Sequence, residues 1–214
     1  MSAGERPAHE MLAELAGLGS ATVYEAGGRR GFVDLDLHRI VPGSRIAGPA
    51  RTVRCGQDDN LMVHAAIERI RPGEVLVLAM PEPAPVALVG DLLATQARVA
   101  GAAGIVIDGA ARDIEELVRI GLPIWARWIR VRGATKERPG AFDVPLVLGG
   151  ATIRPGDVLV ADGDGVAVVE LERLAEVRAA AAAREDAERA RRELLAAGER
   201  SFELDGLRAA FEGG

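Results

Sequence analysis

The chain has 214 residues, of which 49% are hydrophobic and 27% charged, so we expect a globular protein with one domain and an appendage. The formal net charge of −6 argues against a general nucleic-acid binder, because such proteins are normally basic. Cys55 is the single cysteine, which excludes an intrachain disulfide and favours a reducing compartment. The N-terminus lacks a signal-peptide pattern and no apolar run could cross a bilayer, so we expect a cytoplasmic protein without a membrane partner.

The first part of the chain alternates between helical and strand patterns. Helical segments are recognised by apolar residues three and four positions apart, and buried strands by short continuous apolar runs. In chain order these patterns predict helices over 9–18 and 20–26, a strand over 46–54, a helix over 60–70, a strand over 74–79, a helix over 91–100, a strand over 104–107, a helix over 114–120 and a strand over 123–126. Continuous apolar strands between helices are typical of parallel strands covered on both faces.

A short local pattern occurs twice. Residues 71–77 and 154–160 both read Arg-Pro-Gly, an acid and then Val-Leu-Val. We interpret this as the same Pro-Gly turn used twice to begin an apolar strand, and not as a repeat architecture. The second copy continues through 162–165 into the apolar run 166–169, which predicts a hairpin.

From Leu171 to about Gly198 the chain is rich in Ala, Glu, Arg and Leu at helical spacing. This predicts one long surface helix that packs along the domain or reaches a neighbouring subunit. The whole pattern predicts an α/β fold with a mixed sheet, organised as a domain over 1–170 and a helical extension over 171–214.

Several common sites are not supported by the sequence. The glycines at 101–104 precede their strand, and neither G-x-G-x-x-G nor a Walker sequence occurs, which argues against dinucleotide binding. Residues 162–165 resemble the start of a calcium loop, but Val166 occupies a liganding position and no Glu closes the loop. The three histidines are scattered, so a zinc site is not expected.

The most informative pattern is Asp91, a gap of 20 residues, and the pair Arg112-Asp113. The gap holds one predicted helix and one predicted strand, so the chain can return to where it began. Two carboxylates and a guanidinium would then meet at one edge of the sheet. This constellation suits a small oxyanionic substrate beside a divalent metal.

The Arg-Asp pair also has a structural interpretation. Asp113 would be a suitable N-cap or first-turn acid for the helix beginning at Ile114, in a surface ion pair with Arg112. Gly90 favours the functional interpretation, because a glycine at a helix entry exposes free amides that can hold a carboxylate. Arg112 could grip the same carboxylate with its planar guanidinium.

This spacing resembles that of the class II, metal-dependent pyruvate aldolases typified by 4-hydroxy-4-methyl-2-oxoglutarate/4-carboxy-4-hydroxy-2-oxoadipate aldolase, within the RraA-like superfamily. The resemblance covers most of the chain, with further similar blocks at 21–31, 59–64, 123–136 and 198–208. Tyr24 is a departure, since the family more often has His there.

The resemblance implies a swivelling β/β/α-type domain with a long C-terminal helix, assembled as homotrimers or homohexamers with active sites between subunits. It implies a divalent-metal-dependent aldolase that cleaves a 4-hydroxy-2-oxo acid to pyruvate and a second oxo acid. Oxaloacetate decarboxylation is the implied side activity, because it passes through the same pyruvate enolate.

The resemblance also implies roles at matching positions. Asp113 would anchor Mg²⁺ or Mn²⁺, mostly through water. The pyruvate portion of the substrate would be bound by Gly90, Asp91, Leu92, Leu93 and Arg112. Asp91 would hold the water that protonates the enolate, so Asp91 and Arg112 are the expected catalytic residues.

Two other functions are considered beside the aldolase. The RraA branch of the superfamily implies a non-catalytic regulator that binds an endoribonuclease, and fold alone does not separate the two. The presence of Asp91, Arg112 and Asp113 favours the enzyme. A methyltransferase is a weaker alternative, because no glycine-rich cofactor loop is present.

Overall fold

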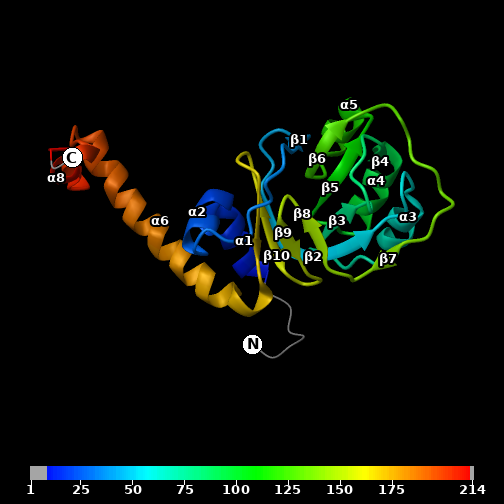
Figure 1. Cartoon of the computed structure of the whole chain (residues 1–214), viewed down its shortest axis with the longest axis horizontal. Coiled ribbons are helices and arrows are strands. Elements are labelled where there is room, and N and C mark those ends of the chain that lie inside the picture. The colour runs from blue at the N-terminus through cyan, green and yellow to red at the C-terminus, as the bar shows by residue number, and fades with distance from the viewer. Residues whose placement is uncertain (1–8, 213–214) are drawn as a thin grey trace.

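The computed structural model describes residues 9–212, which form a layered α/β body from which one long helix projects (Figure 1). The strands of the main sheet are β1 (His38–Arg39), β2 (Ile46–Arg54), β3 (Val75–Ala79), β4 (Ala87–Val89), β5 (Gly104–Ala111), β6 (Ile124–Ile129), β7 (Ala141–Phe142), β10 (Val158–Ala161) and β11 (Val166–Val169). A separate antiparallel pair is formed by β8 (Leu146–Leu148) and β9 (Ala151–Ile153).

The main sheet is mixed, as predicted. Its strand order is β1-β6-β5-β3-β2-β10-β11, with β4 beside β5 and β7 beside β2. The pairs β2–β3, β3–β5, β4–β5 and β5–β6 are parallel, whereas β10 is antiparallel to both β2 and β11. The hairpin predicted after the second Pro-Gly turn is therefore confirmed as β10–β11.

The helices are α1 (His9–Leu18), α2 (Ser20–Ala26), α3 (Leu61–Ile67), α4 (Asp91–Val99), α5 (Ile114–Ile120), α6 (Leu174–Ala196), α7 (Ser201–Leu204) and α8 (Leu207–Glu212), with a 3-10 turn at Leu171–Arg173 before α6. Every predicted helix is present, although the one expected over 60–70 ends at Ile67. In the described part of the chain no helix combines the length and apolarity needed to cross a membrane.

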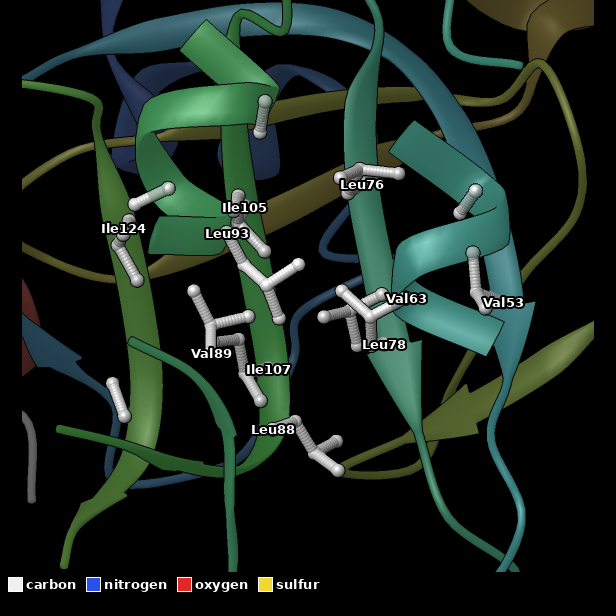
Figure 2. Packing of buried hydrophobic residues seen from close by; sticks show 14 of the residues in the cluster. Val53, Val63, Leu76, Leu78, Leu88, Val89, Leu93, Ile105, Ile107 and Ile124 are labelled. Carbon is white, nitrogen blue, oxygen red and sulfur yellow. The ribbon is translucent and has the colours of Figure 1, made fainter. Parts of the chain in front are cut away.

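The parallel strands are buried on both faces. Leu76 and Leu78 of β3 point toward the side covered by α3, α4 and α5, where they join a large apolar cluster (Figure 2). Val75 and Val77, one position away, join a second cluster with residues of β8, β9 and β10 on the opposite face. Side chains alternate along a strand, so a strand covered twice needs an unbroken apolar sequence.

A third apolar cluster joins α1, α2 and the start of α6 to the hairpin. Within α6 the buried residues are Leu174, Val177 and Ala181, all in its first half. Beyond Ala181 the helix leaves the body and carries α7 and α8 at its far end (Figure 1).

The repeated Pro-Gly pattern is one turn used twice, as interpreted from the sequence. The backbone N–H of Arg71 donates to Glu74 Oε2 at 2.9 Å, and that of Arg154 donates to Asp157 Oδ2 at 2.8 Å. The acid in each copy thus accepts a hydrogen bond from the residue three positions before it. The first copy leads into β3 and the second into β10.

Candidate functional site

The pairing of β4 with β5 brings the predicted site residues to one edge of the sheet. Val89 is the register partner of Ala111, and the Arg112 N–H donates to the Val89 carbonyl at 3.1 Å. Gly90 follows Val89 and Asp113 follows Arg112, so both chain segments leave the sheet side by side. The chain therefore returns after the helix and strand to the place where it left the sheet, as the spacing predicted.

Asp113 turns its carboxylate toward α4. Its backbone is left-handed (φ 59°, ψ 47°), and it occupies the N-cap position of α5 without making a side-chain cap hydrogen bond. Its Oδ2 instead accepts the N–H of Asp91 at 3.3 Å and lies 3.5 Å from Arg112 Nε. The structural interpretation holds for the N-cap position and for the ion pair with Arg112, but the Asp113 side chain does not cap its own helix, because the left-handed backbone directs it toward α4.

Gly90 is packed against these two side chains. Its backbone is extended (φ −130°, ψ −167°), which any residue adopts, so its conformation does not require glycine. A Cβ at this position would overlap Asp113 Oδ2 and lie 3.2 Å from Arg112 Nε. The absence of a side chain at residue 90 is what lets the carboxylate and the guanidinium approach the start of α4.

The Arg112 guanidinium lies between the Gly90 turn and a loop after β6. A Cβ added to Gly133 in that loop would lie 2.7 Å from Arg112 Nη1. The Arg112 side chain is 49% exposed and that of Asp113 36%, so both are reachable by a ligand. With Asp91, the three side chains carry a formal charge of −1, which one divalent cation and one carboxylate would bring to zero.

The two leucines of the predicted site lie differently. Leu93 is 6% exposed and belongs to the core, so only its backbone is available to a ligand. Leu92 is 74% exposed on the first turn of α4. The N–H groups of this first turn have no partners within the helix, and they face the side on which an anion is favoured.

Asp59 is a buried carboxylate near the site whose contacts were not predicted from the sequence. It accepts four hydrogen bonds, from Thr135 Oγ1 (2.6 Å) and from the backbone N–H groups of Leu61 (2.8 Å), Glu137 (2.6 Å) and Arg138 (3.0 Å). Burial alone would raise the pKa of Asp59, but these donors outweigh it and hold the pKa at about 2. Asp59 thereby fastens the loop that contains Gly133.

The donor set fits a hard divalent cation. Among residues 9–212, Oδ1 of Asp113 has no hydrogen-bond partner, whereas Oδ2 has the contacts given above. The same residues contain no group of three His, Cys, Asp or Glu side chains that could hold a metal. A cation here would use Asp113 and complete its shell with water and ligand oxygens, which is the coordination that Mg²⁺ prefers.

The chain is similar to a protein family, to a named protein and to solved structures. A family model described as "RraA-like: Aldolase/RraA" matches residues 20–168. A Halalkalibacterium halodurans protein named "Putative 4-hydroxy-4-methyl-2-oxoglutarate aldolase" is 39% identical over 125 residues, 58% of this chain. The chain spans only 60% of the length of that curated relative.

Two solved structures overlap with nearly the whole fold. An uncharacterized protein from Pseudomonas syringae pv. tomato is 32% identical, with a TM-score of 0.82 over 92% of this chain and 96% of that one. Streptomyces coelicolor RraAS2, described as an unusual member of the RNase ES inhibitor RraA protein family, is 34% identical, with a TM-score of 0.77 over 88% and 98%.

Proposed function

The family match over residues 20–168 places the chain in the RraA-like family, and from this premise we propose that it is a divalent-metal-dependent aldolase. The proposed reaction cleaves 4-carboxy-4-hydroxy-2-oxoadipate or 4-hydroxy-4-methyl-2-oxoglutarate to pyruvate and a second oxo acid. The name of the Halalkalibacterium relative supports this substrate class. The mixed α/β RraA-like fold with a long C-terminal helix, predicted from the sequence, is confirmed.

One observation carries the proposal: the convergence of the Asp91 N–H, Arg112 Nε and Asp113 Oδ2 beside Gly90. The first-turn amides of α4 and the Arg112 guanidinium offer donors to the carboxylate of a 2-oxo acid. Asp113 is the carboxylate beside them that would hold Mg²⁺ or Mn²⁺. When bound, the cation would supply Lewis-acid stabilisation of charge on the 2-oxo group.

Arg112 and Asp91 act at different moments of the proposed reaction. The 4-hydroxyl loses its proton to solvent, C4 becomes the carbonyl of the second oxo acid, and the C3–C4 bond breaks with its electron pair left on the pyruvate fragment as an enolate. Arg112 stabilises that charge where it develops. Loss of such a donor costs about 10²–10³ in kcat, which is the expected effect of Arg112→Ala. Asp91 holds the water that returns a proton to C3, and β-decarboxylation of oxaloacetate would use the same step.

We further propose that the chain assembles as a homotrimer or homohexamer with the sites between subunits. Arg112 is 49% exposed and Leu92 74% exposed in the single chain. Electrostatic stabilisation of an enolate is far stronger where water is excluded, so a neighbouring subunit is needed to cover this surface.

The test is pyruvate release from the two 4-hydroxy-2-oxo acids and from oxaloacetate. Each substrate is assayed with Mg²⁺, with EDTA, and with the Asp113→Ala variant in Mg²⁺. Metal-dependent release that is lost in the variant supports the aldolase, and the order of the substrates identifies the preferred 4-substituent. No release from any substrate, together with no Mn²⁺ binding, would reject the enzyme.

A second function is a non-catalytic regulator that binds an endoribonuclease. The observation in its favour is the similarity to Streptomyces coelicolor RraAS2, a member of an RNase inhibitor family. A complex with a purified endoribonuclease, retained in Asp113→Ala and formed by a chain without turnover, would favour the regulator. Turnover without complex formation would favour the aldolase.

A further inference from the structure

Two segments pack against the Arg112 side chain, and we call them the two walls of the candidate site. The first wall is the Gly90–Asp91 turn that follows β4. The second wall is the loop 132–138, whose Gly133 backbone approaches the Arg112 guanidinium. The loop also accepts a hydrogen bond from β4, since the Ala87 N–H donates to the Arg132 carbonyl at 2.7 Å. The dipeptide Asp59-Asn60 bonds to the second wall and to β4, the strand that leads into the first wall.

Asp59 holds the second wall. Three of its four hydrogen bonds come from loop 132–138, namely from the Thr135 hydroxyl and from the Glu137 and Arg138 amides. All three donate to Oδ2, while Oδ1 accepts the N–H of Leu61 at the start of α3. The carboxylate is completely buried, so water does not compete for these donors. The position of the loop is thereby tied to α3.

Asn60 connects the two walls. Its backbone N–H donates to the Thr135 carbonyl at 2.9 Å, and its side-chain Nδ2 donates to the Leu88 carbonyl at 3.1 Å. Leu88 lies two residues before Gly90. One residue therefore bonds to the loop through its backbone and to the strand before the Gly90 turn through its side chain.

The stability of the fold does not by itself explain a polar side chain at Asn60. The residue is 8% exposed, and its Oδ1 is buried without a hydrogen-bond partner in the described chain. A buried acceptor left unpaired carries a desolvation cost that an apolar side chain of similar size would not have. Its presence is explained by the bond to Leu88 and by what that bond positions.

We propose that Asp59 and Asn60 are positioning residues of the reaction: they fix the separation of the two walls and so hold the Arg112 guanidinium at the start of α4. Neither residue needs to touch the substrate. This inference rests on the proposed aldolase function, because it assigns the two residues to the binding of the pyruvate carboxylate.

The first test changes Thr135, the loop residue whose hydroxyl donates to Asp59. Thr135 is exposed, so Thr135→Val keeps the shape and the fold but removes the hydroxyl that donates to Asp59. We expect kcat/KM for oxaloacetate with Mg²⁺ to fall by about 10-fold to 100-fold, because small displacements of a positioned group have effects of this size. Thr135→Ser, which keeps the hydroxyl and loses the methyl group, should retain most of the activity. If the methyl contact mattered instead, Thr135→Val would stay active and Thr135→Ser would lose activity.

Hydrogen exchange of the loop is the readout that does not depend on turnover. In Thr135→Val the Glu137 and Arg138 amides should exchange faster than in the wild type and in Thr135→Ser. Unchanged exchange would show that Asp59 does not hold the loop. Faster exchange with wild-type kcat/KM would show that the loop does not position Arg112. Either result overturns the proposal.

The second test replaces the Asn60 side chain and has a matched control. Asn60→Leu removes the bond to Leu88. Gln57→Leu removes a neighbouring side-chain amide that bonds to the Glu82 carbonyl and to Asp58 Oδ1 but to neither wall directly, and it keeps the Gln57 backbone carbonyl that accepts Arg138 Nη1. We expect Asn60→Leu to lower kcat/KM at least 10-fold while Gln57→Leu changes it less than twofold. Equal effects of the two variants would contradict the positioning role. An inactive wild-type chain would instead reject the proposed function, so the two failures are distinguishable.

Discussion

At the scale of single residues, the site depends on a position where no side chain fits. Gly90 has an extended backbone open to any residue, yet a Cβ there would overlap Asp113 Oδ2. Only side-chain atoms of Asp113 and Arg112 would have to move. A side chain at residue 90 would therefore disturb the site but not the fold.

Gly90→Ala should accordingly lose function and keep stability. We expect kcat/KM for oxaloacetate to fall at least about 10²-fold, because the carboxylate and the guanidinium are both displaced. The free energy of unfolding in urea should stay within about 0.5 kcal/mol of the wild type. Gly17→Ala is the matched control, since a Cβ at Gly17 meets nothing within 4 Å. Wild-type turnover in Gly90→Ala would contradict the geometry of the site.

Asp59 predicts a pH dependence of stability. Its four donors hold its pKa at about 2, below the ordinary value of 3.8. A folded-state pKa that is lowered means that the charged carboxylate stabilises the fold fully above pH 4 and that this contribution is lost as the pH falls toward 2. The difference corresponds to about 2 kcal/mol.

Asp59→Asn should therefore be less stable than the wild type at pH 7 by about 2 kcal/mol. The stabilities of the two proteins should converge as the pH approaches 2, because the wild-type carboxyl then takes up a proton and loses its charge, as the amide of the variant has none. Urea unfolding at several pH values between 7 and 2.5 measures the difference, and comparing the two chains removes the contributions of other acids. A constant difference over this range would be evidence against the assigned pKa.

At the scale of elements, the start of α5 has a strained backbone at Asp113, and this strain directs the Asp113 carboxylate toward α4. Asp113 has φ 59° and ψ 47°, a left-handed conformation that favours glycine. An aspartate with the usual extended N-cap backbone would accept a hydrogen bond from its own helix, whereas Asp113 accepts the N–H of Asp91 at the start of α4. Strain of this kind costs of order 1 kcal/mol and is found at functional sites.

Asp113→Gly should relieve this strain and abolish the proposed metal-dependent turnover. We expect the free energy of unfolding to rise by about 0.5–1 kcal/mol relative to Asp113→Ala, which loses the same carboxylate but keeps a Cβ in the left-handed region. Urea unfolding of the two variants measures the difference, and pyruvate release is assayed in parallel. Retained metal-dependent release in both variants would exclude Asp113 from the site.

The elements that could be predicted from the sequence are those with strong local patterns. The helix beginning at Asp91 and the strand beginning at Gly104 have clear periodicity and apolar runs, and their succession is enough to predict that the start of this helix lies beside the Arg112-Asp113 pair. The strand continues to Ala111, beyond the predicted Ile107. The sequence pattern ends too early because residues Gly109 to Ala111 are small and lack the β-branched signal of a strand.

What could not be predicted depends on contacts between distant segments or on very short strands. β4 has three residues, too few for a periodic signal, yet it sets the register between Val89 and Ala111. The bonds from Thr135 and Arg138 to Asp59 join positions 76 and 79 residues apart. The side-chain direction of Asp113 follows from a left-handed backbone, for which Asp in sequence gives only a weak preference.

At the scale of the whole molecule, the second half of α6 has no support from the body. Its last buried residue is Ala181, and the helix continues for four further turns into solvent (Figure 1). A groove of about 700 Å³ at its far end is lined by Leu194, Leu195 and Leu204 with several charged residues. Apolar surface of this kind on a projecting helix is typical of a contact between subunits.

Removal of residues 185–214 should therefore change assembly and leave the domain folded. The shortened chain keeps Leu174, Val177 and Ala181, which anchor α6 to α1 and α2. We expect light scattering to give a homo-oligomer for the full chain and a species with fewer subunits for the shortened one. The Tm of the full chain should rise with protein concentration, because assembly stabilises the folded state by mass action, and that of the shortened chain should depend on it less. An unchanged number of subunits after truncation would mean that the oligomer is held by the domain surfaces alone.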